Sequence, residues 1–201
     1  MTVVLDYGMG NLASVEKALR HLGHECRREQ DLADASRLIL PGVGAFGAAM
    51  AALGSRAESI AAFARSGRPV LGICLGQQLL FEEGEEHGRF GGLGLLAGRV
   101  VRLPGEGVKI PHIGWNELHP PHGATQFSSP MLQGIEPGEQ VYFVHSYHCV
   151  AAERSDVAAM SRHGMEFVAA VQRDNVWGCQ FHPEKSGAAG LRILENFLRW
   201  N

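Results

Sequence analysis

The sequence contains the stretch Arg68-Pro69-Val70-Leu71-Gly72-Ile73-Cys74-Leu75-Gly76-Gln77-Gln78-Leu79-Leu80-Phe81, a short apolar strand followed at once by a helical run. Glycines two residues before and two residues after Cys74 allow the backbone to turn sharply without Cβ clashes. Such a turn lifts the thiol out of the sheet and sets it at a helix N-terminus, where the helix dipole favours a thiolate. The pattern predicts that Cys74 is a nucleophile; a buried, inert cysteine after a core strand is the alternative.

Strands and helices alternate along the first part of the chain. Apolar runs predict strands, and helical spacing of apolar residues predicts helices between them. The predicted strands are 2–6, 37–40 and 70–73, and the predicted helices are 12–22, 45–53 and 57–65. This alternation predicts a parallel sheet that is covered by helices on both faces.

The rest of the chain has a different pattern, with short strands separated by turn residues. These strands are predicted at 98–103, 114–118, 140–145, 157–162, 167–172 and 176–181, and a closing helix at 190–200. No internal repeat, low-complexity segment or linker interrupts the pattern. We therefore expect residues 1–201 to form a single α/β domain, with a mostly parallel central sheet flanked by helices and an antiparallel extension.

The bulk composition is that of an ordinary globular protein and excludes some classes of function. The 201 residues are 45% hydrophobic and 19% charged, with a formal net charge of −3, so no basic surface for nucleic acid is expected. No apolar run approaches the roughly 20 residues of a membrane span, and the N-terminus lacks the basic start of a signal peptide. The four cysteines are scattered, which predicts reduced thiols and a cytoplasmic location: Cys26, Cys74, Cys149 and Cys179.

A thiolate nucleophile needs a base, and the base needs a group that orients it. His182 is predicted just past the end of a strand, and Pro183 restricts it to an extended conformation. Residues two apart in an extended chain project to the same side, so Glu184 can reach the imidazole. We expect a triad of Cys74, His182 and Glu184; a loop histidine beside a solvated glutamate is the alternative.

Acyl transfer also needs backbone N–H groups that face the developing negative charge. The residue after the nucleophile, Leu75, supplies one in elbows of this kind. A second is expected from Val43 in the turn Pro41-Gly42-Val43-Gly44, which follows a neighbouring strand. An ordinary strand-to-helix turn explains these glycines as well.

The elbow around Cys74 and the motif His182-Pro183-Glu184 resemble the class I (triad) glutamine amidotransferases. Four further segments resemble one branch of that family, the glutaminase subunits of imidazole glycerol phosphate synthases. They are Asp6-Tyr7-Gly8-Met9-Gly10-Asn11, Pro41-Gly42-Val43-Gly44, Lys109-Ile110-Pro111-His112-Ile113-Gly114-Trp115-Asn116 and Tyr142-Phe143-Val144-His145-Ser146-Tyr147. The third is the most specific. The resemblance covers nearly the whole chain and implies a flavodoxin-like fold.

The resemblance implies hydrolysis of the side-chain amide of L-glutamine to glutamate and ammonia. Cys74 would form a γ-glutamyl thioester, His182 would transfer the protons, and Glu184 would orient His182. The backbone N–H groups of Val43 and Leu75 would form the oxyanion hole. The resemblance implies no cofactor and no metal. The implied substrate-binding residues are Gln78, Glu86, His145, Ser146 and Tyr147.

A partner is expected, because no second domain remains in the chain to use ammonia. The resemblance implies a separate (β/α)8-barrel cyclase subunit, which would make imidazole glycerol phosphate and AICAR in histidine biosynthesis as a heterodimer with this chain. A turn at 42–44 that reorients when the partner binds its nucleotide would couple the two sites. Burial in the core is the alternative for Trp115. The residues expected at the partner interface or the ammonia exit are Asn11, Trp115, Tyr142 and Lys185.

Other interpretations compete with this one. The run Gly8-Met9-Gly10-Asn11-Leu12-Ala13 matches a dinucleotide-binding fingerprint, with Glu29 and Asp31 at suitable spacing. Another cysteine-dependent amide hydrolase or a peptidase would use the same elbow. A non-enzymatic interaction subunit would keep the fold without the catalytic activity. A metal site is the remaining alternative, although no paired cysteine spacing supports it. Its ligands would come from Cys179, His182, Cys149, His148 and His145.

Overall fold

The computed structural model describes residues 1–105, 107–121 and 123–200 and is built around a seven-stranded sheet. Its strand order is β11-β12-β13-β4-β3-β1-β2. Every neighbouring pair from β13 to β2 is parallel, whereas β12 is antiparallel to both β11 and β13. The predicted fold class is therefore confirmed. The strands are β1 (Thr2–Leu5), β2 (Cys26–Glu29), β3 (Arg37–Gly42), β4 (Val70–Cys74), β11 (Val157–His163), β12 (Met165–Arg173) and β13 (Val176–Cys179).

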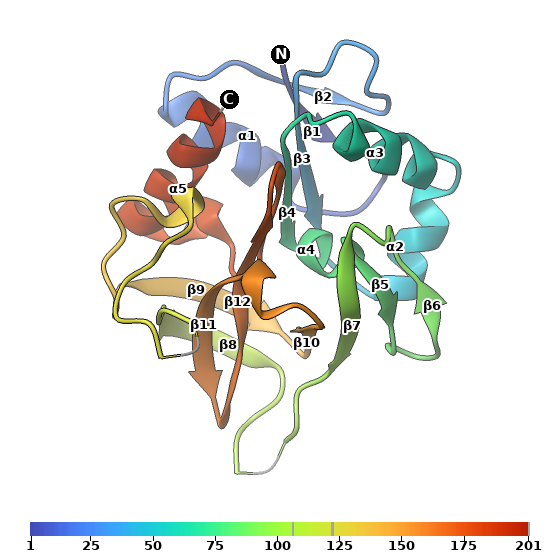
Figure 1. Ribbon diagram of the computed structural model, residues 1–201. Coiled ribbons are helices and arrows are strands. Elements are labelled where there is room, and N and C mark those ends of the chain that lie inside the picture. The colour runs from blue at the N-terminus through green and yellow to red at the C-terminus, as the bar shows by residue number, and fades with distance from the viewer. Residues whose placement is uncertain (106, 122, 201) are drawn as a thin grey trace.

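Helices cover both faces of this sheet, as the alternating pattern predicts. Figure 1 shows α1 and α5 on one side of β3 and β4, and α2 and α3 on the other. The buried side chains divide accordingly into two clusters, one around Leu19, Trp177 and Phe197, the other around Phe46 and Phe63. The helices are α1 (Leu12–His21), α2 (Phe46–Leu53), α3 (Arg56–Arg65), α4 (Leu75–Leu79) and α5 (Gly187–Arg199).

Two smaller sheets lie beside the carboxyl ends of the parallel strands. One has the order β10-β7-β5-β6, and the other pairs β8 with β9 in antiparallel register. Their strands are β5 (Phe81–Gly84), β6 (Phe90–Gly91), β7 (Leu96–Arg102), β8 (His112–Glu117), β9 (Gln140–His145) and β10 (Tyr147–Ala151). Three single turns of 3-10 helix complete the structure: η1 (Pro130–Leu132), η2 (Arg154–Asp156) and η3 (Pro183–Lys185).

Several details differ from the sequence prediction. Strand β2 was not predicted, because its sequence Cys-Arg-Arg-Glu is mostly polar and lies at the sheet edge. Strands β5 and β10 were not predicted either, since each follows another element with at most one intervening residue. Pro41 and Gly42 belong to β3 rather than to the turn after it, and Gly42 pairs with Cys74.

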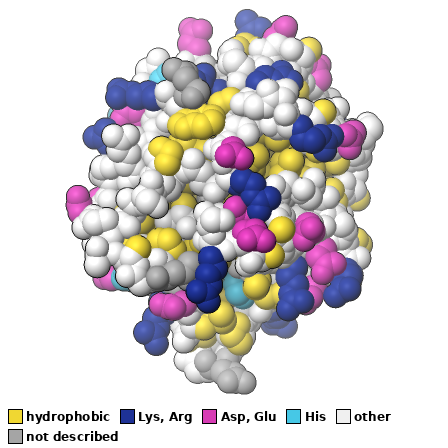
Figure 2. Space-filling model, viewed as in Figure 1, with side chains coloured by type: hydrophobic (Ala, Val, Ile, Leu, Met, Phe, Trp, Pro, Cys, Tyr) yellow, Lys and Arg dark blue, Asp and Glu magenta, His cyan; other side chains and the backbone are white. Residues whose placement is uncertain are grey.

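The surface carries no strongly basic or acidic region on the face seen in Figure 2, where charges of both signs are interspersed. This agrees with the formal net charge of −3. Among the described residues, no helix combines the length and apolar character needed to cross a bilayer.

Candidate active site

Cys74 occupies the sharp turn between β4 and α4. Its φ of 55° and ψ of −111° lie in a region that residues with a Cβ rarely adopt. The glycines around it are required by space as well as by conformation. A Cβ on Gly76 would lie 1.8 Å from the carbonyl oxygen of Leu40, and one on Gly72 would lie 2.5 Å from that of Gly76. The elbow predicted from the sequence is therefore present, and it holds the thiol at the N-terminus of α4.

His182 and Glu184 form a buried pair at the carboxyl end of β13. The Nδ1 atom of His182 is 2.8 Å from Oε1 of Glu184, and both side chains are at most 3% exposed. His182 has an extended backbone, and η3 begins at Pro183, so the two side chains reach each other as the sequence predicted. Nε2 of His182 is buried and makes no regular hydrogen bond to a described residue. It is therefore available to a thiol or a substrate.

The electrostatics of this pair favour a protonated imidazole. Burial by itself lowers the pKa of His182, but interactions with Cys74 and Glu184 outweigh it and raise that pKa to about 9. An imidazolium held next to a thiol stabilises the thiolate, which is the nucleophilic form of cysteine. Cys74, His182 and Glu184 are thus brought together with the charge arrangement that a cysteine nucleophile needs.

Two glutamines behind the elbow complete its surroundings. Nε2 of Gln78 donates to the carbonyl oxygen of Tyr147 and to Oε1 of Gln180, both at 3.0 Å. Nε2 of Gln180 lies 3.7 Å from the sulfur of Cys74, close enough for a weak N–H to sulfur bond. Gln180, which is fully buried, was missed in the sequence, and no local sequence signal identifies it, because its contact with Cys74 joins segments far apart in the chain.

The thiol opens into a small cavity of about 270 Å³. Most of the residues predicted to act on a substrate lie around it, including Ser146 between the two smaller sheets. The lining residues are Val43, Gly44, Cys74, Leu75, Gln78, Glu86, Pro111, Val144, His145, Ser146, Tyr147 and His182. This volume lies just below the range of about 300–1,000 Å³ for pockets that hold drug-sized ligands, so it suits a small molecule.

The turn after β3 borders the cavity, and it differs from the elbow in being exposed. Val43 is 44% exposed, and its N–H donates to no backbone acceptor among the described residues. Gly44 has a φ of 102°, which favours glycine. Tyr7 was not predicted to contribute here, yet its buried hydroxyl donates to the carbonyl oxygen of Pro41 at 2.8 Å.

Glu86 lines the cavity but also has a structural contact. Its Oε2 accepts a hydrogen bond from the backbone N–H of Phe46 at 2.8 Å, which satisfies one of the free N–H groups at the start of α2. A carboxylate has several acceptor positions, so this bond leaves capacity for a cationic group in the cavity.

The residues predicted at a partner interface lie mostly on the β8–β9 sheet or beside it. Trp115 belongs to β8, in agreement with the strand predicted at 114–118, and it is 49% exposed, so burial in the core is excluded. The ring of Tyr142 has two neighbours, the ring of Trp115 at 6.0 Å and Nζ of Lys185, also at 6.0 Å. Asn11 lies elsewhere, in the loop after β1, where it is exposed and caps α1 through its side chain.

The competing sites find little support in the geometry. Gly10 has a φ of 128° and a Cβ there would lie 3.4 Å from Pro41, so this glycine serves close packing of the first loop against β3. Across the described ranges, no cluster of three or more His, Cys, Asp and Glu side chains is arranged to hold a metal ion. The thiol of Cys179 instead faces the carbonyl oxygen of Gly72, at 3.8 Å.

Comparisons with known proteins identify the family of this chain. The family model "Glutamine amidotransferase class-I" matches residues 3–200. The imidazole glycerol phosphate synthase subunit HisH of Desulfitobacterium hafniense is 52% identical, with 100% of this chain and 94% of that relative aligned. The HisH subunit of Syntrophotalea carbinolica is 50% identical, with 98% of each chain aligned.

Solved structures are similar in fold at lower identity. The structure of PurLQS from Thermotoga maritima has a TM-score of 0.77 and 23% identity, covering 98% of this chain and 96% of that one. A glutamine amidotransferase from the same organism has a TM-score of 0.65 and 18% identity, covering 98% and 81%. With a family match along nearly its whole length and HisH relatives identical at half of their positions, the chain belongs to the class-I glutamine amidotransferase family, in the branch of the HisH subunits.

Proposed function

We propose that this chain is the glutaminase subunit of an imidazole glycerol phosphate synthase and hydrolyses L-glutamine through a thioester on Cys74. The observation that carries the proposal is the buried pair of His182 and Glu184, joined at 2.8 Å beside a thiol held in a strained elbow. Membership of the HisH branch supports the same reaction.

The proposed mechanism starts with the thiolate of Cys74, which attacks the amide carbon of glutamine. The negative charge that develops on the amide oxygen is stabilised by the N–H groups of Leu75 and Val43. His182, whose pKa is raised to about 9, gives its proton to the departing ammonia and then removes one from the water that hydrolyses the thioester. Glu184 keeps Nδ1 of His182 protonated throughout, so that Nε2 exchanges the protons.

The cavity supports a glutamine-sized substrate. Ser146 and Tyr147 line it together with Cys74, and Gln78 donates a hydrogen bond to the Tyr147 carbonyl oxygen. We propose that Gln78, His145, Ser146 and Tyr147 position the amino-acid part of glutamine and that Glu86 binds its ammonium group. A peptidase would need an open groove for its polymer substrate, so the small cavity favours the glutaminase.

A cyclase subunit is the proposed consumer of ammonia. Aromatic side chains are common anchors of protein interfaces. Trp115 is 49% exposed and lies beside the half-buried Tyr142, and Ile113, on the same strand as Trp115, is 60% exposed. We propose that this surface, with Asn11 and Lys185, contacts a (β/α)8-barrel cyclase in a heterodimer. The four thiols are all free, which supports a reducing compartment such as the cytoplasm.

The primary test is glutamate release from L-glutamine by the chain assembled with its cyclase and the nucleotide of that cyclase. We expect turnover that is abolished in Cys74→Ser and retained in Cys26→Ser, a matched change of a half-buried thiol outside the cavity. A glutamine analogue with a reactive diazoketone in place of the amide should modify Cys74 alone, as mass spectrometry would show. Turnover that persists in Cys74→Ser would refute the mechanism.

The partner surface is tested separately by titration calorimetry. Trp115→Ala should weaken binding of the cyclase by about tenfold or more, as expected for an interface anchor, while the chain stays folded. Equal affinity in the variant would show that Trp115 lies outside the interface.

A further inference from the structure

A chain of hydrogen bonds runs from β8 to the wall of the candidate active site. Nδ1 of His145 is 2.9 Å from the carbonyl oxygen of Tyr147, and Nε2 of His145 is 3.1 Å from Nδ1 of His112. Nε2 of His112 is 3.1 Å from Nδ2 of Asn116, which also lies 2.7 Å from the carbonyl oxygen of Arg162. None of the catalytic steps proposed above uses His112 or Asn116. We refer to Asn116, His112 and His145 as the polar chain.

The two carbonyl oxygens at its ends fix the direction of every bond. A carbonyl oxygen only accepts, so Nδ1 of His145 carries a proton. Burial lowers the pKa of His145 to about 3, and burial together with the charge of His163 lowers that of His112 to about 4, so each ring is neutral with one proton. Nε2 of His145 therefore accepts, and Nδ1 of His112 donates to it.

The same reasoning orients Asn116. Nε2 of His112 has no proton and accepts, while the Arg162 carbonyl oxygen also accepts, so both must face the amide nitrogen of Asn116. The reversed amide would place its oxygen against two acceptors. A single arrangement of protons thus satisfies the polar chain, and both histidines have the proton on Nδ1, the less common tautomer of a free imidazole.

The rings of the polar chain have little freedom to move. His112 is 3% exposed and lies stacked on His163 at 4.1 Å and on Phe143 at 5.1 Å between ring centres. His145 is 6% exposed and lies 5.0 Å from the ring of Phe167. Hydrogen bonds confined in this way transmit a displacement at one end to the other, because packed interiors have no space to absorb it.

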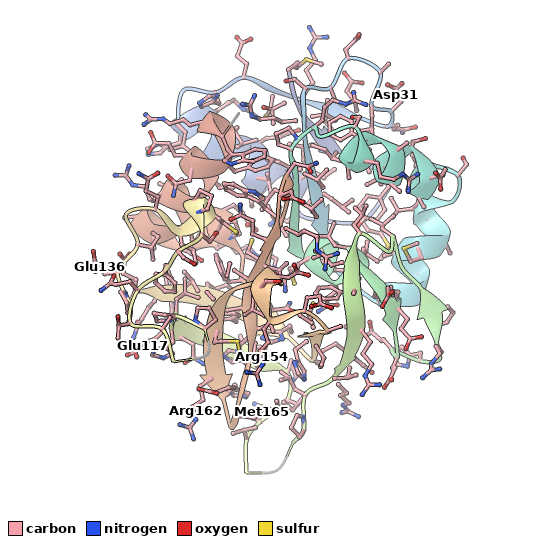
Figure 3. The ribbon with its side chains drawn as sticks, in the orientation of Figure 1. Asp31, Glu117, Glu136, Arg154, Arg162 and Met165 are labelled. Carbon is pink, nitrogen blue, oxygen red and sulfur yellow. The ribbon has the colours of Figure 1, made fainter. Side chains whose placement is uncertain are left out.

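The two ends of the polar chain lie at places that matter for the proposed function. At one end, the Tyr147 carbonyl oxygen accepts from both His145 and Gln78, and all three residues line the cavity. At the other end, Asn116 follows Trp115 on β8, and its second bond reaches the backbone of Arg162, which Figure 3 shows beside Met165 at the end of the β11–β12 hairpin.

We propose that Asn116 and His112 are positioning residues that act through His145 to hold the Ser146–Tyr147 backbone in place for glutamine, and so link the exposed β8 surface to the substrate site. This inference rests on the proposed glutaminase function for its kinetic consequences. The proton arrangement of the polar chain does not depend on which reaction the chain catalyses.

The first part of the test is nuclear magnetic resonance of the histidine side chains. Long-range ¹H–¹⁵N spectra of the chain should show His112 and His145 both neutral at pH 7 with the proton on Nδ1. In Asn116→Asp the two carboxylate oxygens can only accept, so His112 should take a proton on Nε2. In Asn116→Ala the constraint on His112 is removed without a new charge. A proton on Nε2 of either ring in the unaltered chain would overturn the proposal.

The second part measures glutamine hydrolysis by the enzyme assembled with its cyclase. Asn116→Asp should raise KM for glutamine about tenfold with kcat changed less than threefold, since a binding wall is displaced and the reacting groups are not. Asn116→Ala should raise KM as well, and it replaces Asn116→Asp in this test if the aspartate variant does not fold. Glu117→Gln, on the next and exposed position of β8, is the matched control and should leave both parameters unchanged.

Alkylation of Cys74 by iodoacetamide separates the positioning role of Asn116 from the proposed glutaminase function. It requires the thiolate alone, so its rate should be the same in Asn116→Asp and in the unaltered chain. An unchanged KM in both Asn116 variants, with affinity for the cyclase retained, would overturn the positioning role. Absence of glutamine hydrolysis in the unaltered assembled enzyme would instead refute the proposed function, and the tautomers would still decide the proton arrangement.

Discussion

The neighbouring strands β3 and β4 end at the same level, since Gly42 pairs with Cys74, yet their two turns differ in almost every physical respect. The elbow at Cys74 is 6% exposed and strained, with no room for a side chain at Gly72 or Gly76. The turn at Val43 and Gly44 is largely exposed, and the nearest atom to a Cβ on Gly44 is the flexible end of Met9 at 2.8 Å.

The difference separates two requirements of acyl transfer. The packed elbow fixes the nucleophile, so its position does not depend on binding events at the surface. The exposed turn carries a proposed oxyanion donor in a segment with few contacts, where a peptide can reorient at small cost. If the comparison is right, changes at the elbow damage the fold, and changes at the turn affect the rate.

Gly76→Ala should have the largest effect. The new Cβ would lie 1.8 Å from the Leu40 carbonyl oxygen, so β3 and α4 must separate, at a cost above about 4 kcal/mol in free energy of unfolding. Gly91→Ala is the matched control on β6, where a Cβ meets no atom within 4 Å, and it should change stability by less than about 0.5 kcal/mol. Urea unfolding followed by circular dichroism measures both. A stable Gly76→Ala variant would contradict the rigid elbow.

Val43→Pro should follow, because it deletes the N–H proposed for the oxyanion while changing an exposed position. Loss of one such donor lowers kcat about 10²–10³-fold. Val43→Ala keeps the N–H and should stay within about threefold of the unaltered enzyme. The measurement is kcat for glutamine in the assembled enzyme, with thermal unfolding as a check on folding. Equal rates in the two variants would remove Val43 from the oxyanion hole.

Alkaline pH tests the electrostatics of the elbow. Because folding raises the pKa of His182 from 6.5 to about 9, the stability it contributes is complete below about pH 6.5 and is lost as the pH rises through about 9. The proton needed by departing ammonia is lost over the same range, so kcat/KM should fall about tenfold per pH unit above pH 9. Glu184→Gln removes one of the interactions that raise the pKa of His182, so the alkaline fall of kcat/KM should begin at lower pH in this variant.

A second variant in the same site tests the same pH dependence. Cys74→Ser removes the other interaction that raises the pKa of His182, so the loss of unfolding free energy at alkaline pH should begin at lower pH in this variant as well. An alkaline limb at the same pH in Glu184→Gln and the unaltered enzyme would show that another group controls it.

Local patterns account for the parts that the sequence predicted well. The elbow depends on glycines two residues from Cys74, and the His182–Glu184 pair depends on a spacing of two around Pro183, so both are visible over a few residues. Apolar periodicity accounts in the same way for the alternating strands and helices of residues 2–73, apart from the mostly polar strand β2.

Contacts between distant segments account for what was missed. Gln180 approaches the sulfur of Cys74 across 106 residues of sequence, and Tyr7 reaches Pro41 across 34, so no local pattern reveals either contact. Trp115 and Tyr142 fall in two predicted strands, 114–118 and 140–145, but that these two strands pair and place the two rings opposite each other was not predicted. Strand pairing of this kind depends on a partner segment that the local sequence does not specify.

Among the changes predicted at Gly76, Val43, Glu184 and Tyr7, Tyr7→Phe should have the smallest effect. It is also the most direct probe of the turn at Val43 and Gly44. The Tyr7 hydroxyl holds the Pro41 carbonyl oxygen at 2.8 Å, two residues before Val43, and it is 2.8 Å from where a Cβ on Gly42 would lie. Without it, a buried carbonyl oxygen loses its partner, which costs about 1 kcal/mol. The ring keeps its packing, so the elbow is unaffected and only the turn loosens. We expect kcat to fall about fivefold, the equivalent of that energy, with KM unchanged. A changed rate of Cys74 alkylation would show instead that the two turns are mechanically joined, and that the exposed turn is part of the same rigid unit as the nucleophile.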